Sequence, residues 1–462
     1  MRDLTQGSVV RTILAMAIPV AASMLFQTLY VLVDLYFVAA IGEDAVAGVG
    51  TAGTLMFMIM AITQVLGVSA VALISQAVGR KDQAEANVIF NQSLVLSLLC
   101  GSITLLLGYL IGGAFLAGIS ADEGALQEGK TFLYWFLPAM AVQFPIIAMA
   151  SSLRATGIVQ PAMLIQIVTV LLNIALAPVL IAGWGPGPAL GVMGAALATT
   201  IASFVGLILI SVYFIKLEKY VSFQPRTWTP QLKLWWKMLD IGLPAGGEML
   251  LLFVYFSAVY WLIQDFGATA QAGFSIGGRV MQSIFMPTMA IAFAVGPIVG
   301  QNFGAGLPNR VRETFYKGAM LSAVVMFTVT ILLQWRPEVV VRIFTDESDV
   351  VEVASVFLQI VSWNFITQGI VFTASGVFQG LGNTRPALLS SVLRISVFVP
   401  LAFFASRQAG YSIEHIWYVS VISVVIQACF SFWLVVREFR VRFDGGEQAL
   451  PGAPAQVVAE PE

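Results

Sequence analysis

The stretch AIPVAASMLFQTLYVLVDLYFVAAIG, residues 17–42, decides the fold class of this chain. It is apolar throughout except for a few uncharged polar side chains and one charged residue, Asp34. About 20 predominantly apolar residues suffice for an α-helix to cross the hydrocarbon core of a bilayer. The stretch therefore predicts a transmembrane helix that carries one carboxylate.

The composition of the whole chain extends this prediction to nearly all of its 462 residues. Hydrophobic residues make up 58% of the chain and charged residues 10%, with a mean hydropathy of +0.89. A soluble protein carries roughly 25% charged residues to cover its surface. We therefore expect a polytopic membrane protein, and we expect helices because a transmembrane barrel would show alternating apolar and polar residues.

Apolar stretches separated by polar or Gly/Pro breaks predict twelve transmembrane helices in two sets of six. The first set covers about 13–40, 46–78, 88–117, 126–153, 160–182 and 188–215, and the second covers about 236–264, 270–302, 314–335, 350–380, 386–406 and 413–436. We expect an all-α fold with an N-terminal lobe at 8–216, a cytoplasmic linker at 217–235, a C-terminal lobe at 236–440 and a disordered cytoplasmic tail at 441–462.

An internal duplication relates the two sets. When the second half is written under the first so that Pro244 stands below Pro19, identities fall in one ungapped register over a long part of the chain. The further matched pairs include Tyr30 and Tyr255, Gly42 and Gly267, Gln76 and Gln301, Gly79 and Gly304, Gly157 and Gly382, and Pro161 and Pro386. Because each repeat has an even number of spans, the two repeats are parallel and related by an axis along the membrane normal, and we expect a cleft between them.

The distribution of basic residues predicts the orientation. With the N-terminus placed in the cytoplasm, 18 of the 23 Lys and Arg residues lie inside. Arg279 lies within a span, and the outer side receives only Lys130, Arg336, Arg342 and Arg407. Cytoplasmic loops carry an excess of Lys and Arg, so both termini are predicted to be cytoplasmic.

Asp34 is the clearest functional candidate. It lies about seven residues from the outer end of its helix, which places the carboxylate roughly 10 Å below the outer boundary. Gln27 and Tyr30 share its face, two turns and one turn earlier. A bare charge at this depth is costly, so Asp34 must be protonated or paired with a cation, and either state can couple transport to an ion. The structural alternative is an acid locked in a hydrogen bond between helices.

Further polar residues stand at similar depths in other spans. Asn173 could supply an oxygen beside Asp34, with both as ligands if the ion is Na⁺, or could only hold helices together. Glu248 is close to the midplane and shares a face with Tyr255, which suits a cationic substrate or a second protonation. Asn364 and Gln368 lie one turn apart and could hydrogen-bond a substrate, although helix packing explains them equally well.

Several other functions are disfavoured. The net charge of −2 offers no basic field for a nucleic acid. One histidine, His415, excludes clustered His ligands, and no nucleophile–base or metal motif points to an enzyme. No cofactor is implied. A flippase for a lipid-linked or other amphipathic precursor remains an alternative, but it should show several basic residues in its cavity, where only Arg279 is a candidate.

The chain resembles the multidrug and toxic compound extrusion (MATE) family, and within it the bacterial NorM-like branch. The motifs that carry the resemblance are the first-span stretch, ISQAVGRKDQAEAN at 74–87, SLRATGIVQPAMLI at 152–165, GLPAGGEML at 242–250, IVGQNFGAG at 298–306 and GVFQGLGNTRPALL at 376–389.

The resemblance implies two six-helix lobes around a central cavity, with export of organic cations or drugs in exchange for H⁺ or Na⁺. We expect a protein of the bacterial inner membrane that functions as a monomer, since one pseudo-symmetric chain already forms a complete cleft. Asp34, Asn173 and Glu248 match acidic and amide positions of the family. Ala177 and Gln368 stand where some members have further acids, so we expect coupling at Asp34.

Overall fold

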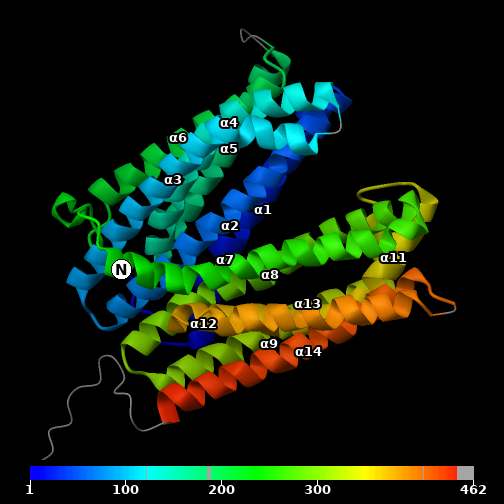
Figure 1. The fold of residues 1–462 in the computed structure, drawn as a ribbon. Coiled ribbons are helices and arrows are strands. Elements are labelled where there is room, and N and C mark those ends of the chain that lie inside the picture. The colour runs from blue at the N-terminus through cyan, green and yellow to red at the C-terminus, as the bar shows by residue number, and fades with distance from the viewer. Residues whose placement is uncertain (121, 185–188, 409, 445–462) are drawn as a thin grey trace, which may run out of the picture. The chain divides into compact units, whose positions relative to one another are not determined.

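The computed structural model describes residues 1–120, 122–184, 189–408 and 410–444, and in these ranges regular structure is entirely helical. Figure 1 shows long helices joined by short connections. The α-helices are α1 (Val9–Ala39), α2 (Glu43–Gly79), α3 (Gln83–Ile119), α4 (Glu123–Ala155), α5 (Gln160–Ala182), α6 (Val192–Lys216), α7 (Leu232–Ile263), α8 (Ala268–Gly304), α9 (Pro308–Trp335), α10 (Pro337–Val341), α11 (Ser348–Val361), α12 (Asn364–Leu381), α13 (Arg385–Ser406) and α14 (Ile413–Phe439).

The predicted all-helical polytopic membrane fold is confirmed. Among the described residues, 11 helices are long and apolar enough to cross a membrane, and the number rises to 12 when the bent pair α11 and α12 is one span. Each of the twelve predicted apolar stretches corresponds to one of these helices or to the bent pair. The hydropathy pattern located the spans because the polar connections between them are short.

The tenth predicted span, 350–380, is broken rather than continuous. α11 and α12 meet at an angle of 59° around Ser362 and Trp363, and no proline stands at the break. Side chains of α9 bond to the carbonyl groups near it. The hydroxyl of Thr330 donates to the Ser362 carbonyl at 2.9 Å, and the amide of Gln334 donates to the Gln359 carbonyl at 2.6 Å. A bend at membrane depth is tolerated where polar neighbours satisfy the freed backbone groups.

Glycines at repeat-related positions end or begin the helices in the same way in both halves. Gly157 and Gly382 follow α4 and α12 with φ angles of 78° and 70°. Gly42 and Gly267 precede α2 and α8 with φ angles of 149° and 86°. These angles lie in regions that residues with a Cβ rarely adopt. The duplication therefore preserves the turns as well as the apolar stretches.

The chain forms two compact units. Unit 1 comprises Met1, Ile18–Ala70 and Ala84–Leu250, and unit 2 comprises Arg2–Ala17, Val71–Gln83 and Leu251–Glu462, the last range being described up to residue 444. The start of α1, up to Ala17, and the end of α2 thus belong to unit 2, whereas α7 up to Leu250 belongs to unit 1. The division into lobes at 8–216 and 236–440 stays a prediction.

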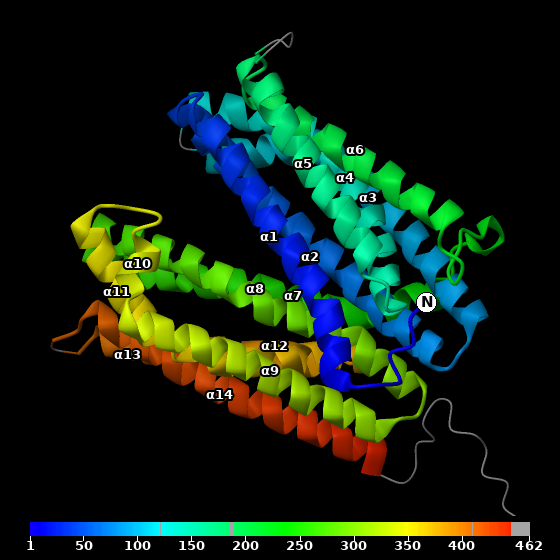
Figure 2. The ribbon, with the colours of Figure 1, turned by 180° about the vertical axis from the view of Figure 1, so that it is seen from behind.

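In unit 1, α4 and α5 pack against α6, and α3 lies beside them in both views (Figures 1 and 2). Part of the predicted linker is held on α3 by three amide side chains. Asn87 donates to the Tyr220 carbonyl at 3.0 Å, Asn91 donates to the Ser222 carbonyl at 2.9 Å, and Gln92 donates to the Thr227 and Thr229 carbonyls. These bonds satisfy backbone groups that have no helical partner, so the segment is ordered.

In unit 2, α8 packs against α9, α11 and α12, and α13 packs against α14, as Figures 1 and 2 also show. The N-terminal segment joins this unit through Leu4, which is fully buried. The Leu4 amide donates to Oε1 of Gln301 at 3.0 Å, and Nδ2 of Asn302 donates to the Leu4 carbonyl at 3.3 Å.

Close contacts between helices of unit 2 depend on glycine. A Cβ on Gly300 would collide with the Ser75 side chain, and one on Gly304 would collide with the carbonyl of Gln76. In the repeat-related contact, a Cβ on Gly79 would collide with the carbonyl of Gln301. The ends of α2 and α8 therefore approach each other through small residues, as expected for tightly packed membrane helices.

Two sequence expectations change with the structure. The count of basic residues placed Arg394 in the cytoplasm, but it lies inside α13, nine residues after Arg385 and thus roughly 13 Å along the helix. The predicted disordered tail began at residue 441, yet a π-helical segment, Arg440–Asp444, continues from α14. The remainder of that tail, 445–462, lies outside the described residues.

Candidate functional site

The candidate site in unit 1 is built from three membrane helices, α1, α5 and α6. Asp34 stands on α1 and is half-buried, one turn after Tyr30. Asn173 stands on α5 and is 3% exposed. The two residues predicted for ion coupling therefore belong to the same compact unit.

Thr199 of α6 links these helices. Its hydroxyl donates to the carbonyl of Ala195 at 3.3 Å and accepts a hydrogen bond from Nδ2 of Asn173 at 3.0 Å. The hydroxyl of Tyr30 also lies 3.0 Å from Oγ1 of Thr199. With the hydrogen of the threonine hydroxyl donated to Ala195, Tyr30 is the donor to Thr199. Thr199 thereby holds α1 and α5 at fixed positions beside α6.

This network leaves two acceptor atoms unused. Oδ1 of Asp34 and Oδ1 of Asn173 are both buried and have no hydrogen-bond partner among the described residues. Thr199 cannot satisfy them, because its hydrogen is already donated. Neither oxygen has a donor among the described residues, so the Asp34 carboxylate requires either a proton or a cation. The oxygens that remain free are those that H⁺ or Na⁺ would bind.

The other predicted residues of α1 and α5 behave differently. Gln27 lies two turns before Asp34, and its side chain is exposed. Ala177, one turn after Asn173, is fully buried and packs into the apolar core of unit 1. Among the described residues no group of three or more His, Cys, Asp or Glu side chains is arranged to hold a metal ion.

In unit 2 the structure brings together Tyr255 and Asn364 but not Glu248. The hydroxyl of Tyr255 lies 2.7 Å from Oγ of Ser420, and Nδ2 of Asn364 lies 3.5 Å from the same oxygen. Gln368, one turn further along α12, is 8% exposed. Glu248 is half-buried on α7 and belongs to unit 1. The predicted substrate-binding residues therefore divide between the two units.

Three residues that matter to these clusters escaped the sequence reasoning: Thr199, Ser420 and Arg394. Thr199 and Ser420 occupy matching places, each seven residues after the first residue of its helix, Val192 of α6 or Ile413 of α14. They bond the repeat-related tyrosines, Tyr30 and Tyr255. The match between the tyrosines was visible in the sequence and could have prompted a search for hydroxyl partners.

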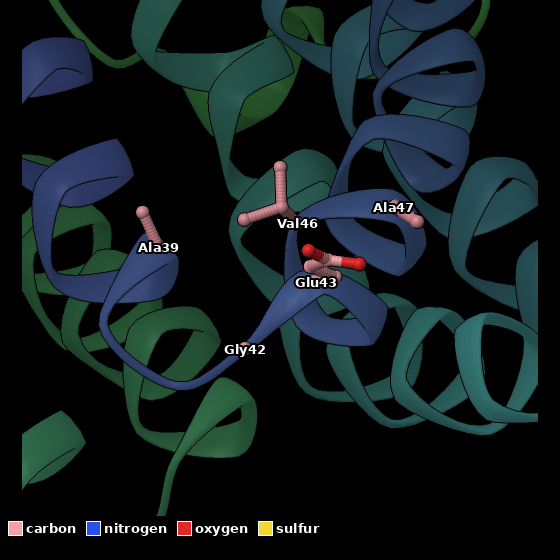
Figure 3. A pocket seen from close by; sticks show the side chains of 5 residues that line it. All are labelled: Ala39, Gly42, Glu43, Val46 and Ala47. Atoms are coloured by element: carbon pink, nitrogen blue, oxygen red, sulfur yellow. The ribbon is translucent and has the colours of Figure 1, made fainter.

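A surface pocket lies at the C-terminal end of α1, where the chain connects to α2. It has a volume of about 320 Å³ and is lined by Ala39, Gly42, Glu43, Val46 and Ala47, as Figure 3 shows. It contains none of the predicted site residues. The unpartnered oxygens of Asp34 and Asn173 lie outside this pocket.

Comparison with known proteins agrees with this architecture. The sequence profile of the MatE family matches residues 19–179 and again residues 244–404, so its two matches begin at Pro19 and Pro244, the first pair of the internal repeat. The chain is 26% identical to the Probable multidrug resistance protein YoeA of Bacillus subtilis over 419 residues, covering 89% of this chain and 90% of that protein. It is 25% identical to the Probable multidrug resistance protein NorM of Thermotoga maritima over 427 residues, covering 90% of each.

Solved structures support the same fold. A structure described as the outward-facing conformation of a multidrug resistance MATE family transporter matches with a TM-score of 0.89 at 22% identity, covering 95% of this chain and 98% of that one. A crystal structure of MATE in complex with MaL6 matches with a TM-score of 0.90 at 22% identity, with the same coverage of each chain. Because the family profile covers both halves of the chain, the resemblance seen in the sequence is confirmed, and this chain is a member of the MatE family of membrane transporters.

Proposed function

We propose that the protein is a secondary active efflux transporter that exchanges H⁺ or Na⁺ for organic cations or drugs by alternating access. The observation that carries the proposal is the pair of buried, unpartnered oxygens on Asp34 and Asn173. A transporter needs a group whose ion occupancy changes during the cycle, and an ionisable residue within a membrane helix is such a group. The names of the relatives, multidrug resistance proteins, support drugs as the cargo.

The proposal gives the remaining residues distinct tasks. Asp34 and Asn173 bind the coupling ion, and both act as ligands if that ion is Na⁺. Gln27, Tyr30, Glu248, Tyr255, Asn364 and Gln368 contact the substrate. The protein works as a monomer in the bacterial inner membrane, with both termini in the cytoplasm and two six-helix lobes at 8–216 and 236–440.

The decisive experiment is export of rhodamine 123, a fluorescent organic cation, from proteoliposomes. A pH gradient and a Na⁺ gradient are imposed separately on the wild type and on Asp34→Asn. We expect one gradient to drive export and Asp34→Asn to abolish that drive, since the amide cannot exchange a proton and binds Na⁺ more weakly than a carboxylate does. The gradient that works identifies the ion.

Asp346→Asn is the matched control, because Asp346 is exposed in the connection between α10 and α11 and the chemical change is the same. It should export like the wild type. Export by Asp34→Asn at the wild-type rate would contradict the coupling role. Absence of gradient-driven export by the folded wild type, across rhodamine 123, ethidium and other cations, would contradict the exchange mechanism.

One observation favours a second candidate, a flippase for a lipid-linked precursor. The sequence offered only Arg279 as an intramembrane base, and the structure adds Arg394 within α13. Guanidinium groups bind phosphates well. Transfer of a fluorescent phospholipid analogue across the proteoliposome membrane, without any imposed ion gradient, is the result that this candidate requires.

A further inference from the structure

Arg394 lies inside a membrane helix of unit 2, α13. The guanidinium carbon of Arg394 lies 4.0 Å from the centre of the Tyr255 ring. Phe398, one turn later on α13, packs against the same ring with centres 4.9 Å apart. Tyr255 is 6% exposed and Phe398 is fully buried. Two residues of α13 thus contact one tyrosine of α7, and the contact fixes where the guanidinium stands.

Arg394 is unusual because nothing neutralises it. Among the described residues, none of the ion pairs involves Arg394, and its Nε is buried without a hydrogen-bond partner. An aromatic ring attracts the cation but accepts none of its five N–H hydrogen bonds. A charge within a span is costly, so an unneutralised guanidinium at this depth needs a partner from outside the chain.

The same cluster offers an unpartnered acceptor. Asn364 reaches Ser420, which bonds to Tyr255, and Asn364 is 3% exposed. Its Oδ1 has no hydrogen-bond partner among the described residues. A donor, Nε of Arg394, and an acceptor, Oδ1 of Asn364, are therefore both unsatisfied within one connected cluster of side chains. We refer to Tyr255, Asn364, Arg394 and Ser420 as the Arg394 cluster.

The repeat shows that the cluster differs in charge from its counterpart in unit 1. In the register that pairs Tyr30 with Tyr255, Asp34 corresponds to Val259 and Thr169 corresponds to Arg394. Both tyrosines contact a hydroxyl group, Tyr30 that of Thr199 and Tyr255 that of Ser420, although in this register Thr199 corresponds to Val424. The unit 1 site thus carries an acid, whereas the unit 2 site carries a base.

We propose that the Arg394 cluster is a binding site for the oxyanion of a zwitterionic cargo. The guanidinium binds a carboxylate or phosphate group, and Oδ1 of Asn364 accepts a hydrogen bond from an N–H donor of the same molecule. This inference rests on the proposed transport function and narrows its substrate class. Guanidinium groups suit oxyanions because their planar fork donates two parallel hydrogen bonds, and these are stronger at low dielectric.

The test uses two dyes that differ by one group. Rhodamine 110 carries a free carboxylate, and rhodamine 123 is its methyl ester. Binding of each dye to the purified protein is measured by fluorescence anisotropy for the wild type, Arg394→Gln and Arg394→Lys. Arg407→Gln is the control, since Arg407 is exposed after the same helix and also stacks on an aromatic ring, that of Phe403, at 4.4 Å.

We expect Arg394→Gln to weaken binding of rhodamine 110 about 10- to 100-fold, the size of a lost charged hydrogen bond, and to leave rhodamine 123 within about twofold. Arg394→Lys keeps the positive charge but lacks the planar guanidinium group, so we expect it to weaken rhodamine 110 binding less than Arg394→Gln does. Equal losses for both dyes would show that Arg394 acts only through packing and would overturn the proposal. Unchanged binding of both dyes, or no binding of rhodamine 110 by the wild type, would also overturn it.

Competition against bound rhodamine 110 distinguishes a lipid phosphate from a carboxylate as the natural oxyanion. Displacement of rhodamine 110 by a short-chain phosphatidic acid, dependent on Arg394, supports the site and identifies a lipid phosphate as a ligand. Displacement only by carboxylates supports the site and identifies the cargo as a carboxylate. Failure of the transport proposal is seen separately, as absence of gradient-driven rhodamine 123 export, which does not involve Arg394.

Discussion

At the scale of single residues, the unit 1 site depends on which hydrogens are already used. The Thr199 hydroxyl donates its hydrogen to the Ala195 carbonyl of its own helix and accepts hydrogen bonds from Tyr30 and Asn173. Oδ1 of Asp34 and Oδ1 of Asn173 therefore have no donor among the described residues. Sequence reasoning found Asp34 and Asn173 because a carboxylate and an amide are rare in such apolar stretches. It missed Thr199 because threonines in membrane helices commonly bond only the preceding turn, as Thr12 and Thr51 do here.

Replacing Thr199 with valine keeps the shape and removes the hydroxyl. Nδ2 of Asn173 and the hydroxyl of Tyr30 would then be buried without their acceptor, at a cost of about 1–3 kcal/mol for each group. We expect Thr199→Val to lower the thermal midpoint in detergent and to slow gradient-driven rhodamine 123 export, because the oxygens of Asp34 and Asn173 are no longer held in place.

The neighbouring Thr200→Val separates the two effects. Thr200 donates to the Trp135 carbonyl at 2.8 Å and takes no part in the Thr199 network. We expect Thr200→Val to lower the stability of the protein but to keep the ion dependence of export. If Thr199→Val exports like Thr200→Val at matched temperature, the network has only a structural role.

At the scale of the helical elements, two features were beyond the hydropathy pattern. At the bend between α11 and α12, Thr330 and Gln334 of α9 donate hydrogen bonds to the carbonyls near the break. A window of apolar residues cannot reveal it, because the partners come from another helix. For the close approach of α2 and α8, the sequence shows the glycines of 296–304 at four-residue spacing, which is typical of a close-packing helix face. Their partners, Ser75 and Gln76, emerged only from the structure.

The glycine contact can be tested with a matched pair of helix substitutions. In Gly304→Ala the new methyl group would meet the backbone carbonyl of Gln76, which cannot move aside. We expect a destabilisation of about 1–3 kcal/mol, typical of overpacking. The measurement is the thermal midpoint by intrinsic fluorescence in detergent.

Gly50→Ala is the control, because Gly50 lies within α2 and nothing stands within 4 Å of its added Cβ. Alanine is the better helix former, so this variant should be unchanged or more stable. Equal midpoints for Gly304→Ala and Gly50→Ala would show that the helices separate readily and that the contact is not tight.

At the scale of the whole molecule, the duplication organises the chain. One constant offset relates turns, glycines and tyrosines in both halves, and the family profile matches twice with the same displacement, from 19–179 to 244–404. The halves have nevertheless diverged in charge, with Asp34 in one and Arg394 in the other. A duplicated framework with different charged groups can serve two different ligands, an ion and a cargo.

The predicted orientation is a property of the whole chain and is tested with reporter fusions. We expect green fluorescent protein fused after Glu462 to fluoresce in bacteria, and alkaline phosphatase at the same place to be inactive, because the phosphatase folds only outside the cytoplasm. The physical reason is the excess of basic residues in the cytoplasmic loops.

The same two reporters are also fused to a chain truncated after Gln408, in the connection between α13 and α14. Because that connection is predicted to be outside, we expect active phosphatase and no green fluorescence there. Active phosphatase at the C-terminus would reverse the assigned orientation. It would also reverse the side from which Asp34 is reached.

The sequence by itself determined the helical membrane fold, the positions of the spans, the duplication and the two principal residues of the proposed ion site. These follow from local quantities: the length of apolar stretches, the rarity of charge within them and the spacing of identical residues. The tertiary structure alone decided that Thr199 joins Tyr30 to Asn173, that the tenth span bends, and that Arg394 stands inside a helix against Tyr255. These depend on contacts between residues far apart in the chain, and no local pattern in the sequence records which distant side chain satisfies a given hydrogen bond.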